Sequence, residues 1–128
     1  MTKMADLSKD LEKFLLPVFK RKPKTITALD VSKLTSYTDT IIIITCMSSR
    51  QTNAIAEYLF QELKKQGVIA LGKEGLKQGT WVLLDFGTVI IHIFDADTAT
   101  VYDLEGLWSD APRIDLSSLE AQLPLENS

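Results

Sequence analysis

The residues most capable of chemistry are a pair of acids, Asp95 and Asp97, that directly follow an apolar run. Paired carboxylates at the end of a strand can hold Mg²⁺ for nucleotidyl transfer. That chemistry also needs a glycine-rich backbone to cradle phosphate, and the six glycines of the chain nowhere form a phosphate-loop pattern. We therefore interpret the two acids as part of a polar loop. A metal-dependent nucleotidyltransferase that uses them is the alternative.

The second candidate for chemistry is the pair of Cys46 and His92, the only cysteine and the only histidine of the chain. Cys46 closes an apolar run without a cationic neighbour in sequence that would lower its pKa, so we expect a buried structural thiol. His92 interrupts the apolar run 90–94 and should either face outward or be buried with a hydrogen-bond partner. The sequence thus predicts no catalytic residue, no disulfide, no metal site and no cofactor.

The first secondary-structure element that the sequence predicts is a helix. Apolar side chains recur at helical spacing from Leu7 to Val18, which predicts an amphipathic helix, and Pro17 should end or kink it. The next segments are a basic connector at residues 20–24, a short strand near 26–30 and, at 40–46, a β-branched run typical of a buried central strand.

The clearest boundary of the chain follows that run. Ser48 with Gln51 three residues later forms a capping box, so a second helix should begin there and end at Gly67. The later elements that we expect are a strand beginning at 68–71, a hairpin of strands 81–84 and 89–94, a short strand at 99–102, a turn or brief helix at 104–108 and a weak helix near 116–123.

This alternation predicts an α/β fold, a single-domain mixed β-sheet covered by helices. We divide the chain into an N-terminal helix and basic connector (1–25), the α/β domain itself (26–115) and a polar C-terminal tail (116–128). The apolar runs are too short to cross a bilayer, and the acids near the N-terminus do not match a signal peptide, so we expect a cytoplasmic protein without a membrane partner.

Charge is distributed unevenly along the 128 residues, although their net charge is only −3. Residues 1–24 hold seven Lys or Arg and three acids, whereas residues 85–128 hold one Arg and nine acids. An acidic surface repels phosphate, so the C-terminal half disfavours nucleic acid and suits a basic protein partner, and we expect no direct DNA binding. Solvated surface charge that only keeps the domain soluble is the competing interpretation. The basic connector 20–24 could contact phosphate, which makes a generic RNA-binding adaptor a further alternative.

Several short motifs, in one order, resemble the ribosomal silencing factor (Iojap-like) family. They are Leu29-Asp30-Val31-Ser32, Ser48 with Arg50-Gln51 and Ala54-Ile55-Ala56, Glu74-Gly75, Trp81-Val82-Leu83-Leu84-Asp85, His92-Ile93-Phe94, and Tyr102-Asp103-Leu104-Glu105 with Leu107-Trp108. The chain departs from the family pattern at Thr40, Cys46 and Ala99. The resemblance implies a nucleotidyltransferase-like fold without its active site, and this chain accordingly lacks a Gly-Ser dipeptide.

The resemblance also implies a binding protein rather than an enzyme. Members of the family bind ribosomal protein L-fourteen on the large ribosomal subunit and sterically block its association with the small subunit, which represses translation. The expected partner-binding residues are Trp81, His92, Phe94, Tyr102, Leu104 and Trp108. Plain core packing is the competing interpretation, above all for Phe94 and Leu104. The resemblance leaves a homodimer of the isolated protein open.

Overall fold

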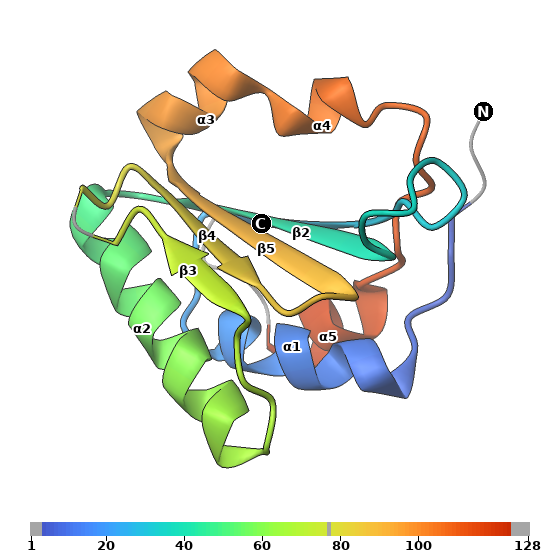
Figure 1. The fold of residues 1–128 in the computed structure, drawn as a ribbon, viewed down its shortest axis with the longest axis horizontal. Helices are drawn as coiled ribbons and strands as arrows, with labels where there is room; N and C mark the ends of the chain where they lie inside the picture. Colours follow the sequence, from blue (N-terminus) through green and yellow to red (C-terminus); the bar gives the residue numbers. More distant parts are fainter. Residues whose placement is uncertain (1–3, 77, 124–128) are drawn as a thin grey trace.

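The protein is a five-stranded mixed sheet with helices on both faces, as the sequence predicts (Figure 1). The computed structural model describes residues 4–76 and 78–123. Its elements are α1 (Lys9–Lys20), β1 (Thr25–Asp30), β2 (Thr40–Cys46), α2 (Ser49–Lys65), β3 (Gly72–Glu74), β4 (Trp81–Asp85), β5 (Val89–Asp95), α3 (Ala96–Tyr102), α4 (Leu104–Leu107) and α5 (Ser117–Gln122).

The strands lie in the order β1-β2-β5-β4-β3. β2 and β5 are parallel over seven residue pairs, from Thr40 opposite Val89 to Cys46 opposite Asp95, whereas the other neighbouring strands are antiparallel. β2 therefore occupies the interior of the sheet, as its β-branched sequence predicts. The predicted hairpin is also confirmed, since β4 and β5 pair in the antiparallel sense through the connection at 86–88.

The first helix is longer than its proline suggests. Ser8 caps its start by accepting a hydrogen bond from the Leu11 amide, at 3.2 Å. We expected Pro17 to end or kink the helix, and the first of these two outcomes is wrong, because α1 continues to Lys20. Because proline lacks an N–H, it removes only one hydrogen bond from a helix. The last turn of α1 is completed by the amides of Arg21 and Lys22, which donate to the carbonyls of Val18 and Phe19, respectively.

The second helix starts and stops where the sequence predicts. The Ser48 hydroxyl accepts from the Gln51 amide at 3.1 Å, but the Gln51 side chain accepts from the Met47 amide, at 2.7 Å, rather than from the cap residue itself. Gly67 ends the helix with φ +82°, and the Val68 amide donates to the Leu63 carbonyl. This arrangement is a Schellman motif.

Of two strands expected in the second half, one starts later than predicted and the other is wrong. The strand expected to begin at 68–71 is β3, which starts at Gly72 because its partner β4 ends at Asp85, the residue opposite Gly72. Residues 99–102 belong to helix α3 rather than to a strand. The Asp95 carboxylate accepts from the Thr98 amide at 2.8 Å and thereby caps α3, so a local cap outweighs the strand preference of threonine and valine.

The brief helix near 104–108 and the weak helix near 116–123 are confirmed as α4 and α5. Residues 1–3 of the predicted N-terminal segment and residues 124–128 of the predicted C-terminal tail lie outside the described residues. Leu119 of α5 and Leu15 of α1 are both buried in the same core cluster as the central strands. Both ends of the described chain therefore help to cover the sheet.

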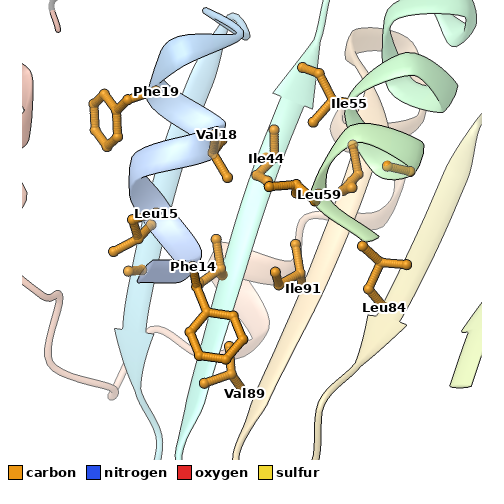
Figure 2. Close-up of a cluster of buried hydrophobic side chains, with 14 of the residues drawn as sticks. Phe14, Leu15, Val18, Phe19, Ile44, Ile55, Leu59, Leu84, Val89 and Ile91 are labelled. Atoms are coloured by element: carbon orange, nitrogen blue, oxygen red, sulfur yellow. The ribbon is translucent and has the colours of Figure 1, made fainter. Parts of the chain in front are cut away.

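The helices α1, α2 and α5 cover one face of the sheet, which we call the closed face (Figure 1). The main core lies between these helices and the strands (Figure 2). Figure 2 shows Phe14, Leu15 and Val18 from α1 and Ile55 and Leu59 from α2 against the strands. The buried strand residues beneath them include Ile44, Leu84, Val89 and Ile91. Complete apolar burial on this side supplies most of the hydrophobic stabilisation of the fold.

Candidate partner-binding face

The opposite side of the sheet, which we call the open face, is covered only in part, by α3 and α4 (Figure 1). Strand alternation decides which residues reach it. In β5, Ile91 and Ile93 belong to the core cluster of the closed face, whereas Phe94 belongs to a separate cluster on the other side. His92 therefore also points to the open face, and the cross-strand register places Trp81 opposite Phe94 and Leu83 opposite His92.

Trp81 is the centre of an aromatic group on the open face. Its ring centroid lies 4.9 Å from that of Phe94, 4.7 Å from that of Tyr102 and 5.9 Å from that of His92. The His92 and Phe94 rings stack with centroids 6.2 Å apart. β4, β5 and α3 each contribute to this group, so residues that are scattered over 22 positions of the sequence form one surface. Rings in such tilted contacts hold one another in place.

His92 combines the two arrangements that the sequence leaves open, since it lies half-buried on the open face and has a hydrogen-bond partner. Its Nδ1 accepts from the indole Nε1–H of Trp81 at 3.1 Å. Burial lowers the pKa of His92 from 6.5 to about 4, so the ring is neutral at neutral pH and retains this acceptor. The histidine thus orients the indole, and no acid or nucleophile approaches it in the described hydrogen bonds.

The structure brings all six predicted partner-binding residues to the open face, but with different exposure. Phe94 is 1% exposed, so it supports Trp81 from below. Leu104 and Trp108 are half-buried against the apolar cluster of this face. Trp81 and His92 are also half-buried, and Tyr102 is 53% exposed. The five residues other than Phe94 are therefore accessible to a partner in part or in full.

A hollow of about 340 Å³ lies beside the aromatic group, between the sheet, α4 and the loop at 35–38. Its walls include Leu104, Trp108 and His92, together with Tyr37 and Leu83, which the sequence analysis missed. Alternation from Trp81 would have placed Leu83 on the same face. Tyr37 is 73% exposed in a polar loop, and no periodicity could have assigned it to the site.

A second hollow, of about 500 Å³, lies on the other side of Trp81 and extends to Tyr102 and the edge strand β3. The Glu74-Gly75 turn forms its rim. Gly75 has φ +87°, and a Cβ atom there would overlap the carbonyl of Trp81. Only glycine allows the turn to approach the strand this closely, which gives that predicted motif a structural reason.

Helix α4 is held against the sheet by polar contacts. The Glu105 carboxylate accepts from Arg113 at 2.9 Å and from the hydroxyl of Thr27, on β1, at 3.1 Å. The acids Asp97, Asp103 and Asp110, which are exposed, carry no ion pair among residues 4–76 and 78–123. The helices that frame the open face therefore present uncompensated negative charge.

The residues suspected of catalysis do not form a catalytic centre. Asp95 caps α3 and Asp97 lies in its first turn, so the expected loop is a strand end followed at once by a helix. The described part of the chain contains no group of three or more His, Cys, Asp or Glu residues that could hold a metal ion. Cys46 is fully buried, and burial raises its pKa to about 11, which keeps the thiol protonated and unreactive.

None of the helices in residues 4–76 and 78–123 is long and apolar enough to cross a membrane.

The chain is similar to proteins of one family. The family described as "Ribosomal silencing factor during starvation" matches residues 5–127. The protein named ribosomal silencing factor RsfS from Chromobacterium violaceum is 42% identical over 87 residues, which cover 68% of this chain and 71% of that protein.

The relative of the same name from Halalkalibacterium halodurans is 34% identical over 99 residues, covering 77% of this chain and 85% of its own length. Among solved structures, a Chromobacterium violaceum protein superposes with a TM-score of 0.74 at 38% identity, covering 77% of this chain and 82% of that one. A Bacillus halodurans protein gives a TM-score of 0.75 at 31% identity, covering 84% and 98%.

Proposed function

The chain belongs to the ribosomal silencing factor family, and from that premise we propose that its open face binds ribosomal protein L-fourteen on the large subunit and blocks association with the small subunit. The bound protein represses translation without covalent chemistry, metal or cofactor. It acts in the cytoplasm, on the ribosomes there.

The aromatic group around Trp81 is the observation that carries this proposal. Large aromatic side chains that are partly exposed and held rigidly by their neighbours are the usual anchors of protein interfaces. Tyr102, in contact with Trp81, is more than half exposed although it lies beside an apolar cluster. The two hollows beside Trp81 provide concave surface for side chains of the partner.

The charge of the open face favours a basic partner. Asp97, in α3, and Asp103, between α3 and α4, are exposed. They attract Lys and Arg side chains and speed the encounter.

Inhibition then follows from occupancy alone. A folded body of 14.3 kDa that sits on the joining surface of the large subunit fills space that the small subunit needs. Because the factor and the small subunit exclude one another, binding of the factor shifts the population toward free large subunits. No bond is made or broken in this scheme.

Co-sedimentation with isolated subunits tests the proposal. The protein should travel with large subunits and remain behind when only small subunits are present. Purified L-fourteen should bind it directly, and Tyr102→Ala should weaken both interactions in parallel. Equal sedimentation with both subunits, or direct binding to L-fourteen that Tyr102→Ala leaves unchanged, would contradict the proposed site.

A further inference from the structure

A cluster of basic residues lies at the end of the sheet where β1 begins and β2 and β5 end, in line with the row of paired residues that leads to Phe94 and Trp81. We call it the basic end, and its members are Lys20, Arg21, Lys22, Lys24 and Arg50. We propose that the basic end binds phosphates of ribosomal RNA on the large subunit, as a second contact beside the open face. This inference rests on the proposed function, since it names a second component of the same docking site.

The connector between α1 and β1 is fixed to the start of α2. The Gln51 side-chain amide donates to the Lys22 carbonyl at 3.3 Å, and the Lys24 amide donates to the Thr45 carbonyl at 2.9 Å. Arg21 stacks over the Tyr58 ring of α2, with its guanidinium carbon 4.2 Å from the ring centroid. These contacts bring two segments that are distant in sequence into one positively charged surface.

The backbone of the connector is arranged so that its charges point outward. Lys22 has φ +50°, the left-handed region that side chains other than glycine seldom adopt, and the next residue, Pro23, is buried. Lys22, Lys24 and Arg50 are all exposed. A pinned backbone with outward basic side chains loses little conformational freedom when it binds, because the connector is already ordered.

These charges are not neutralised within the protein. The ion pairs found in residues 4–76 and 78–123 join Lys65 to Glu62 and Arg113 to Glu105, and none involves the basic end. The positive end of the α2 dipole adds to the same field, since Arg50 lies in the first turn of that 17-residue helix. A surface of this kind attracts anions at close range.

Phosphate of RNA is the anion that fits best. The aromatic ring beside these charges, Tyr58, is already covered by Arg21, so the basic end suits the sugar–phosphate backbone rather than the bases of RNA. The negative charge of α3 and its flanking residues repels RNA and favours a basic protein. The large subunit presents both kinds of surface, so neighbouring surfaces of opposite charge can orient the protein on it.

A triple variant tests the proposal. Lys22→Gln, Lys24→Gln and Arg50→Gln remove three exposed charges without touching the core. The matched control, Lys9→Gln, Lys64→Gln and Lys65→Gln, removes the same charge at the other ends of α1 and α2. Affinity for purified large subunits and for isolated L-fourteen is measured for both variants and the unchanged protein over a range of salt concentrations, with thermal unfolding as a check of folding.

The triple variant should bind large subunits at least about tenfold more weakly at moderate salt and lower the slope of log affinity against log salt by about 2. Its affinity for isolated L-fourteen should equal that of the control. Equal affinity and equal slope of the two variants on the subunit would overturn the inference, as would a loss that appears on isolated L-fourteen as well. Failure of the unchanged protein to bind subunits would instead refute the proposed function.

Discussion

The closed and open faces of the sheet are made by the same strands, yet helices cover the two faces to different extents. On the closed face, β2 and β5 contribute Ile42, Ile44, Ile91 and Ile93, all fully buried under α1, α2 and α5. On the open face the short helices α3 and α4 contain no buried residue of their own and leave two hollows beside Trp81. One side of the strands is thus fully covered, whereas the other combines a smaller buried cluster with surface that remains accessible.

The largest effect that should separate the faces is on folding. Leu59→Ala, in the closed core, should lower the free energy of unfolding by about 4 kcal/mol, because it removes buried apolar surface and leaves a cavity. The fraction that remains folded should bind large subunits normally. Chemical denaturation combined with a titration of subunits below the unfolding transition measures both quantities, and a lower affinity of the folded fraction would show that the faces are coupled.

The second prediction concerns His92 on the open face, whose protonation should make the free energy of unfolding depend on pH. Its pKa of about 4 in the folded protein lies below the 6.5 of the free side chain, so the unfolded chain takes up the proton first. The stability that His92 contributes is complete above about pH 6.5 and is lost as the pH falls toward 4, a change of roughly 3 kcal/mol.

His92→Asn is the matched variant for this prediction, because it offers an oxygen acceptor to Trp81 but does not titrate. Denaturation at several pH values should show a smaller loss of stability between pH 6.5 and 4 in the variant than in the unchanged protein. Parallel pH profiles of the two proteins would mean that groups other than His92 govern acid stability.

Binding should be most sensitive to the aromatic group. Trp81→Ala or Tyr102→Ala should weaken large-subunit binding by about 2 kcal/mol or more, as expected for interface anchors, and should affect folding less. The control is Ile69→Ala, which truncates an exposed apolar residue outside both hollows. Paired measurements of affinity and thermal unfolding decide the matter. A large loss of stability with unchanged affinity of the folded fraction would assign these rings to the core instead.

The smallest effect is expected for the two acids that suggested metal chemistry. Asp95→Ala with Asp97→Ala should leave subunit binding within about twofold, and it should cost about 1 kcal/mol of stability through loss of the α3 cap. Asp95→Ser with Asp97→Ala retains a capping side chain and should recover most of that stability. Any Mg²⁺-dependent activity on nucleotides that the double variant abolishes would overturn the binding-protein account.

Much of the fold could be predicted from local sequence. The β-branched run of β2 and the Ser48 cap of α2 act through neighbouring residues, and both elements begin within one residue of the prediction. The prediction failed at residues 99–102 because the Asp95 side chain caps a helix at Thr98, and this local contact outweighs the strand preference of threonine and valine. The strand expected from 68–71 starts at Gly72 because its partner β4 ends opposite that residue. The first failure overlooked a signal within a few residues, whereas the second depends on pairing with another segment of the chain.

The residues of the open face were predicted less completely than the elements of the fold. Motif resemblance brought together Trp81, His92 and Tyr102, but it could not show that Phe94 lies beneath them at 1% exposure. Tyr37 went unnoticed because its role depends on where the 35–38 loop crosses the sheet. Residue type indicates which side chains can bind a partner, and only the three-dimensional arrangement decides which of them a partner can reach.

Steric exclusion of the small subunit is tested by the order of addition in a subunit-joining experiment. Added to separated subunits, the protein should reduce the fraction of whole ribosomes seen in a sucrose gradient, and added to ribosomes already joined it should have little effect. The Tyr102→Ala variant should inhibit much less in the first arrangement. Undiminished joining at a saturating concentration of the unchanged protein would contradict the account, as would equal inhibition in both orders of addition.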